Sequence, residues 1–143
     1  MIIHQHKFVK ELLEYHSMEN EYPVKSPLPS NLKVLYEKAE LLSDPTIYRQ
    51  LVGKLNFLQH TRPDIAFTTQ FLSQFNHNPT QNHLNAAFHV LRSLKGTMFQ
   101  GLFFNNKDDL KLEAFCDSDW AACPNTRRSV SGYFITLGGS PFF

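Results

Sequence analysis

The sequence predicts an α+β chain in which a small antiparallel helix cluster leads into an incomplete antiparallel sheet. Apolar residues recur at helical spacing from about residue 44 to 96, and from Leu110 to Leu137 they follow strand patterns. With 143 residues, of which 42% are hydrophobic and 13% aromatic, the chain has enough apolar surface for a packed core. These patterns divide the chain into residues 1–21, 22–43, 44–97 and 98–143.

The first two segments predict a helix and a linker. Gln5 to Tyr15 carries an apolar stripe at helical spacing, which indicates an amphipathic helix. Three prolines between Glu19 and Asn31 exclude a helix interior and predict an extended linker. Leu32 to Leu42 fits either a weak helical turn or a loop. The stripe is Phe8, Val9, Leu12 and Leu13, and the prolines are Pro23, Pro27 and Pro29.

Residues 44–97 predict three helices joined by short connections. Asp44 and Pro45 favour the start of the first helix, because Asp44 accepts hydrogen bonds from free amides and proline suits the first helical position. Gly53 inside this helix costs about 1 kcal/mol relative to alanine, so we expect another backbone to approach closely there. The remaining boundaries are a capping box at Thr61-Arg62-Pro63-Asp64, an end near Asn76, a third start at Asn78-Pro79 and an end at Gly96.

The last segment predicts strands. Leu102 to Phe104 is a short strand, Asn105 to Asp109 a polar turn, and Leu110 to Cys116 alternates as a strand with one buried face. Cys123 to Thr126 predicts a turn. The β-branched and aromatic residues that follow return the chain antiparallel until Gly138-Gly139.

Asp117 and Asp119 are the candidate site residues of this hairpin. In extended backbone, carboxylates two residues apart leave the strand on the same side. Such a pair suits a hard divalent cation such as Mg²⁺, which takes oxygen ligands. The alternative is structural, because aspartate at a strand end is also a turn former that bonds nearby backbone, here around Trp120.

Composition excludes several other classes. Fourteen basic and thirteen acidic residues leave a net charge of +1, so any nucleic-acid contact must be local. Cys116 and Cys123 are too few for a disulfide framework and are interpreted as free thiols. The histidines have no zinc-site spacing and suit surface or capping positions. No apolar run reaches membrane length, and charges interrupt the start of the chain, so we expect no membrane contact and an intracellular location, cytoplasmic by default.

The motifs of the hairpin and of residues 48–67 resemble one family. FCDSDWAACPNTRRSVSGYFITLGGSP is similar to the opening hairpin of the ribonuclease H domain in copia-type retrotransposon Pol polyproteins, and YRQLVGKLNFLQHTRPDIAF to the stretch that links reverse transcriptase to it. The helix at residues 5–15 resembles one that follows the polymerase palm. The likeness covers nearly the whole chain, so residues 1–21 would end the reverse transcriptase region. Residues 44–97 would then be the connection, and 98–143 a ribonuclease H-like hairpin region.

The resemblance implies site roles. Asp117 matches the family's first metal-binding carboxylate, a ligand of Mg²⁺, and Asp119 is a weaker neighbour. The family's other carboxylates come later in the domain, and Pro141-Phe142-Phe143 stands where its Trp-x-x-x-x-Gln continuation is expected. Since a two-metal site needs several carboxylates, we expect a truncated, catalytically incomplete fragment.

Two alternatives remain open. The chain could be a residual module that binds an RNA–DNA hybrid, or it could act as a ribonuclease H when another chain completes the site. The open sheet edge also predicts self-association. The candidate phosphate contacts are Arg49, Lys54, Arg92, Lys95, Arg127 and Arg128, although solvent exposure is the simpler interpretation for the first two.

Overall fold

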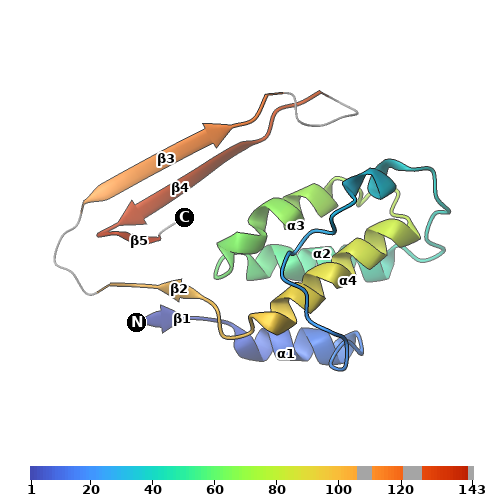
Figure 1. Cartoon of the computed structure of the whole chain (residues 1–143), viewed down its shortest axis with the longest axis horizontal. Helices are drawn as coiled ribbons and strands as arrows, with labels where there is room; N and C mark the ends of the chain where they lie inside the picture. Colours follow the sequence, from blue (N-terminus) through green and yellow to red (C-terminus); the bar gives the residue numbers. More distant parts are fainter. Residues whose placement is uncertain (106–110, 121–126, 142–143) are drawn as a thin grey trace. The chain divides into compact units, whose positions relative to one another are not determined.

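The structure is a computed structural model that describes residues 1–105, 111–120 and 127–141. It contains two compact units: a helical unit, His4–Gly101, and a β unit formed by Met1–Ile3 and the described residues from Leu102 onward (Figure 1). Helices and two small antiparallel sheets together confirm the predicted α+β class. No helix in the described ranges has the length and apolar character that crossing a bilayer requires.

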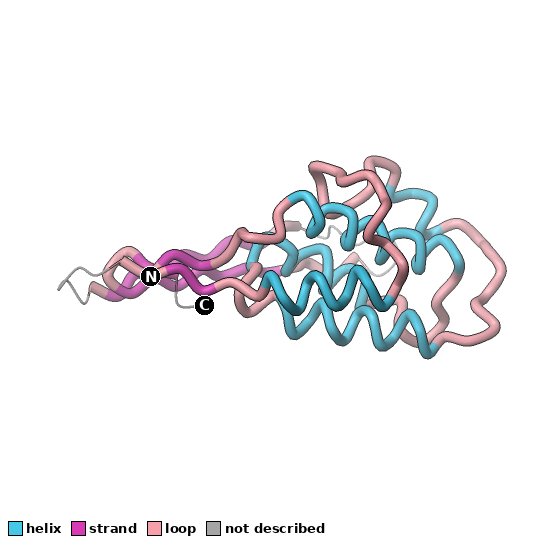
Figure 2. Tube along the Cα trace, turned by 90° about the horizontal axis from the view of Figure 1, so that it is seen from below, coloured by secondary structure: helices cyan, strands magenta, loops and turns pink. Residues whose placement is uncertain are grey.

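The helical unit is organised around its longest helix, α4 (Gln81–Gly96), which contacts the three other α-helices. These are α1 (His6–Tyr15), α2 (Thr46–Leu58) and α3 (Ala66–Ser73). Both the cartoon (Figure 1) and the tube trace (Figure 2) show α1 and α4 side by side. The predicted helices are therefore confirmed, and a 3₁₀ turn, η1 (Leu32–Tyr36), interrupts the linker. Residues 22–31 contain no helix, as the prolines predict.

The apolar stripes of these helices meet in one core. Tyr48 of α2 is fully buried, and its hydroxyl donates a 2.7 Å hydrogen bond to the Leu72 carbonyl of α3, so its polar atom is satisfied. Aromatic side chains of α3 and η1 pack around the edge of the core. The buried apolar residues are Val9, Leu12, Leu13, Leu35, Leu51, Val52, Leu55, Leu58, Ile65, Leu72, Leu84, Ala86, Ala87, Val90, Leu91 and Leu94.

Two predicted helix starts differ in detail. The Thr61–Asp64 capping box is wrong, because no side chain caps the short 3₁₀ turn η2 (Pro63–Ile65) that precedes α3. Asp64 instead binds Arg62, and Thr61 bonds back to the Leu58 carbonyl. The capping box lies at the start of α4, where Thr80 and His83 cap each other's backbone, one residue after the predicted Asn78-Pro79 start. At α2, the Asp44 carboxylate accepts from the Thr46 amide at 2.8 Å, as predicted.

The glycine prediction was placed on the wrong residue. Gly53 lies on the exposed side of α2, and a Cβ added there would meet nothing within 4 Å. Gly96 is the close approach, because a Cβ there would lie 3.3 Å from the Pro23 Cβ. It ends α4, as predicted, while it also allows the linker to pass.

The β unit contains two sheets. β1 (Ile2–Ile3) pairs with β2 (Leu102–Phe103), so the predicted strand at residues 102–104 belongs to a separate sheet that the sequence did not reveal. β3 (Leu112–Ser118) and β4 (Ser131–Leu137) pair antiparallel, which confirms the hairpin. Gly138 and Gly139, with φ of 58° and 72°, then turn the chain into β5 (Ser140–Pro141).

The predicted buried face of β3 is wrong. Leu112 is 66% exposed, and Ala114 and Cys116 are also exposed, because no described element of the β unit covers the hairpin. An alternating pattern reports which side chains share a face, but burial needs a second layer. The predicted turn Cys123–Thr126 lies outside the described residues, as does all of Asn105–Asp109 except Asn105.

Candidate functional site

Asp117 lies near the end of β3, opposite Gly132 of β4. Opposed residues in an antiparallel pair share a face, and glycine has no side chain to cover the carboxylate. Asp117 is exposed and its carboxylate has no partner in the part of the chain that the structure describes. It is therefore free to accept a ligand.

Asp119 has a structural task. Its Oδ1 accepts a 2.6 Å hydrogen bond from the Val130 amide, and its own amide donates to the Val130 carbonyl at 3.0 Å. These two bonds extend the β3–β4 ladder past the ends of both strands. The Asp119 carboxylate thus stabilises the end of the hairpin. It bonds to Val130 across the hairpin and not to backbone beside Trp120.

The carboxylates present do not fit a two-ion site by themselves. Within residues 1–105, 111–120 and 127–141, no three His, Cys, Asp or Glu side chains lie close enough to share a metal ion. Asp119 has one oxygen committed to Val130, and Asp117 alone offers too few oxygens for Mg²⁺ held by protein. No metal-dependent step follows from these residues alone.

Two of the candidate phosphate contacts stabilise the helical unit from α2. Arg49 donates from Nε to the Asn76 carbonyl at 2.9 Å and from Nη2 to the His77 carbonyl at 3.2 Å, so it satisfies backbone after the end of α3. The Nζ of Lys54 lies 4.1 Å from the centroid of the Tyr15 ring, a cation–π contact between α2 and α1.

Arg92 and Lys95 hold the proline-rich linker on α4. Arg92 Nε donates to the Tyr22 carbonyl at 2.8 Å, and the Val24 amide donates back to the Arg92 carbonyl at 3.3 Å. Lys95 Nζ donates to the carbonyls of Glu19 and Glu21, the latter at 2.7 Å. Both cations therefore satisfy carbonyls of a segment that has no helix or sheet partners of its own.

The hairpin end presents a different kind of surface. Arg127 and Arg128, which precede β4, are exposed and have no side-chain partner among the described residues. Trp120, which follows Asp119, is 92% exposed. An exposed aromatic ring with nearby cations is the combination that stacks bases and neutralises phosphates. The sequence analysis missed Trp120, although a tryptophan directly after a strand end is a usable signal.

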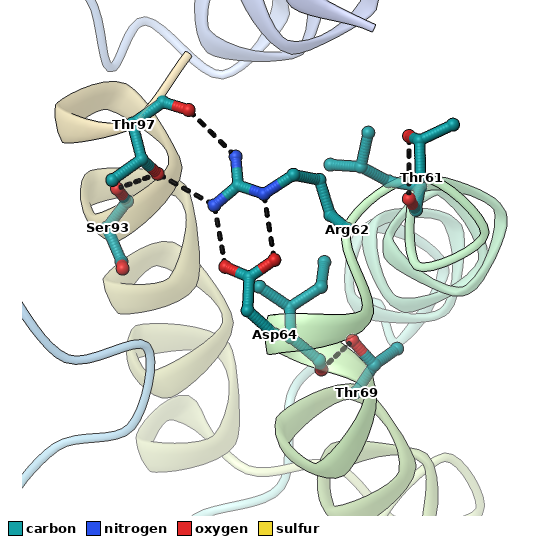
Figure 3. A network of polar contacts seen from close by, with 8 residues as sticks. Thr61, Arg62, Asp64, Thr69, Ser93 and Thr97 are labelled. Atoms are coloured by element: carbon teal, nitrogen blue, oxygen red, sulfur yellow. Dashed lines mark hydrogen bonds and ion pairs between the residues drawn. The ribbon is translucent and has the colours of Figure 1, made fainter. Parts of the chain in front are cut away.

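Arg62 is the other residue whose role the sequence analysis missed. Its side chain is 2% exposed, and Figure 3 shows its guanidinium between Asp64 and Thr97. It binds Asp64 in a bidentate ion pair, with 2.9 and 2.7 Å bonds, and donates to the Thr97 carbonyl at 2.9 Å and to its Oγ1 at 2.7 Å. These four bonds join η2 to the residue that follows α4. The Arg-x-Asp spacing around Pro63 was the available signal.

Burial lowers the pKa of three histidines. For His83, burial lowers the pKa, while the bond to the Leu35 carbonyl acts in the opposite direction. Its Nδ1 accepts from the Thr80 amide at 2.9 Å and its Nε2 lies 2.8 Å from that carbonyl, which assigns the proton to Nε2. Burial also lowers the pKa of His16 and of His89. His83 is therefore a capping residue, one of the two kinds of position that the sequence analysis expected for the histidines.

Comparisons with known proteins place the chain in a family. No protein-family model and no solved structure matches it. The uncharacterized mitochondrial protein AtMg00810 of Arabidopsis thaliana is 38% identical over 138 residues, or 96% of this chain and 57% of that protein. The retrovirus-related Pol polyprotein from transposon RE1 of the same plant is 39% identical over 137 residues, which cover 96% of this chain. The retrovirus-related Pol polyprotein from transposon TNT 1-94 of Nicotiana tabacum is 34% identical over 144 residues, which cover 94% of this chain.

The chain spans only part of these relatives, with 9% of the RE1 polyprotein and 11% of the TNT 1-94 polyprotein matched. In each case the similarity extends through the helical unit and the β unit. The chain is therefore homologous, over nearly its whole length, to a segment of the retrovirus-related Pol polyproteins of copia-type transposons.

Proposed function

We propose that this chain forms the junction between the reverse transcriptase and ribonuclease H regions of a copia-type Pol polyprotein. The helical unit would be the connection and the β3–β4 hairpin the first strands of the ribonuclease H domain. The observation that carries the proposal is the similarity to Pol polyproteins over 96% of the chain, because it includes both units and the Asp117 strand. The division of the described residues into two compact units, with a change of unit between Gly101 and Leu102, supports a boundary near Leu102.

In this proposal, Asp117 contributes one carboxylate to a Mg²⁺ site. Its exposure at the end of β3 and its free oxygens support that role. Other parts of a polyprotein would supply the remaining ligands, because the described residues hold no further cluster that could bind the ion. We therefore expect no cleavage of an RNA–DNA hybrid by this chain alone.

A second candidate function is binding of an RNA–DNA hybrid at the hairpin end. Exposure of Trp120, Arg127 and Arg128 favours this position. Arg49, Arg92 and Lys95 instead make bonds to backbone carbonyls that phosphate contacts would have to replace. Binding should weaken with salt, and removal of two phosphate contacts should reduce the log–log slope by about 1.8.

The proposed function is tested in a chimaera and in the isolated chain. In the RE1 polyprotein with its matching segment replaced by this chain, Asp117→Asn should reduce hybrid cleavage at least a hundredfold and leave DNA synthesis unchanged. Glu113→Gln, on the same strand, is the matched control. Equal cleavage by the Asp117→Asn chimaera and its parent would refute the assigned role.

The isolated chain separates the two candidates. It is incubated with a labelled hybrid in Mg²⁺ or Mn²⁺, and retardation and cleavage are read together. Retardation that is lost in Arg127→Ala/Arg128→Ala and retained in Lys7→Ala/Lys10→Ala would support binding at the hairpin end. Metal-dependent cleavage that Asp117→Asn abolishes would show that the chain is catalytically complete, against our proposal.

A further inference from the structure

β3 has an open edge. The strand order β3-β4-β5 leaves one side of β3 unpaired within the described residues. The Lys111 carbonyl and the Asp119 amide both bond toward β4, to Gly138 and Val130. Because successive residues of a strand alternate in direction, Leu112, Ala114 and Cys116 point their amides and carbonyls at the open side. An unpaired row of this kind is a template for another strand.

The usual protections of an edge strand are weak here. The seven residues of β3 contain no proline, and Leu112 and Phe115 are 66% and 57% exposed. Its charges are Glu113 and Asp117, with Lys111 just before the strand. The Lys111 ammonium lies 2.8 Å from the Glu113 carboxylate, so this end of the strand carries a local ion pair.

A second copy of the chain is the partner that these charges fit. In an antiparallel pair of identical strands, a two-fold axis perpendicular to the sheet relates the copies, and opposed side chains must share a face. The axis must then pass beside a residue that faces its own copy. The residues nearest the middle of β3 are Ala114, Phe115 and Cys116. An axis beside each of them gives a different set of opposed charges.

Only one of these three registers opposes unlike charges without also opposing like charges. Centring on Phe115 places Lys111 opposite Asp119 but Glu113 opposite Asp117, and centring on Cys116 places Glu113 opposite Asp119, so both registers are penalised by like charges. Centring on Ala114 places Lys111 opposite Asp117 twice, once on each side of the axis. We propose that two copies of this chain pair antiparallel through β3 in the register centred on Ala114.

This register joins two hairpins into one sheet in the order β4-β3-β3-β4. Leu112 lies opposite Cys116 of the second copy, so the exposed apolar strips of both hairpins become continuous. The pairing uses backbone groups and two ion pairs, and it does not depend on the proposed function. It occupies Asp117, so a metal ion bound there would compete with it.

Cysteine cross-linking tests the register. All variants carry Cys123→Ser, so that Cys116 is the remaining native thiol. With Leu112→Cys, the new thiol faces Cys116 of the other copy in a hydrogen-bonded pair, about 5.5 Å between Cα atoms, which suits a disulfide. Within one chain the same two positions are about 14 Å apart. Mild oxidation should therefore give a covalent dimer.

Two controls fix the interpretation. Cys116 alone should not cross-link, because its two copies would also be about 14 Å apart. Glu113→Cys places its thiol on the opposite face from Cys116 and should not cross-link either. A dimer formed by Cys116 alone would show the register centred on that residue and would overturn the proposal. So would failure of Leu112→Cys to cross-link at concentrations where the chain is dimeric by sedimentation.

Charge reversal gives an independent test that does not need a disulfide. Lys111→Asp and Asp117→Lys should each weaken dimerisation roughly tenfold, since each change opposes like charges twice. The double variant restores opposite charges and should regain the parent's dimerisation constant. Circular dichroism confirms that the variants retain their fold. Additive weakening in the double variant, or a chain that is monomeric at millimolar concentration, would refute the pairing.

Discussion

The Arg62–Asp64 pair should respond unequally to the loss of either partner. Arg62 is 2% exposed, whereas Asp64 is 41% exposed. Removing Asp64 leaves a guanidinium charge buried, while removing Arg62 leaves a carboxylate that water reaches. We therefore expect Asp64→Ala to destabilise the helical unit more than Arg62→Met, although the arginine makes more hydrogen bonds.

The magnitudes follow from what each change leaves behind. Removing one partner of a buried ion pair destabilises a protein by about 3–5 kcal/mol. In Asp64→Ala the two bonds from Arg62 to Thr97 remain, so we expect a loss at the lower end of this range, about 3 kcal/mol. Arg62→Met replaces the side chain by an apolar one of similar length. This change leaves the Thr97 carbonyl without its donor and costs about 1–2 kcal/mol.

Urea unfolding followed by circular dichroism at 222 nm measures this difference, because the α-helices of the described residues all belong to the helical unit. Lys10→Met is the control: the Lys10–Glu14 pair spans 3.6 Å between exposed side chains and should contribute less than about 0.5 kcal/mol. Equal losses for Asp64→Ala and Arg62→Met, or a larger loss for Arg62→Met, would refute the argument from burial.

Two further predictions concern His83 and the glycines. Burial lowers the pKa of His83 below its usual 6.5, so the unfolded chain takes up its proton first and the free energy of unfolding falls as the pH drops below 6.5. His83→Gln should make that decline shallower in urea titrations between pH 7 and 5. It should not abolish the decline, because His16 and His89 also have lowered pKa values. An unchanged slope would contradict a lowered pKa of His83. Gly53→Ala should stabilise α2 by about 1 kcal/mol, whereas Gly96→Ala should gain less or lose stability, because its Cβ would lie 3.3 Å from Pro23; thermal unfolding compares the two, and equal gains would count against the close approach.

The sequence predicted the elements better than their partners. Helical spacing located α1, α2 and α4, and alternation located β3, because both periods are properties of a single segment. The composition of β4, rich in β-branched and aromatic residues, is likewise a local property. The pairing of Ile2–Ile3 with Leu102–Phe103 was not predicted, since two-residue strands carry no period and their partners lie far apart in sequence. The close approach was assigned to Gly53 instead of Gly96 for the same reason: a glycine does not reveal which segment passes over it.

The cationic residues of the candidate site show most clearly that the sequence does not reveal a side chain's partner. A long cationic side chain satisfies a backbone carbonyl or a phosphate with the same donors, so Arg92 and Lys95 on α4 looked equally suited to nucleic acid and to structure. The deciding fact is the linker at Glu19–Val24, whose carbonyls lack helix or sheet partners and are met by those two side chains. Arg127 and Arg128 have no such segment over them among the described residues. If hybrid binding occurs, its salt dependence should therefore change when Arg127 and Arg128 are replaced. It should stay the same when Arg92 is replaced, even though Arg92 lies on the regular surface of a helix.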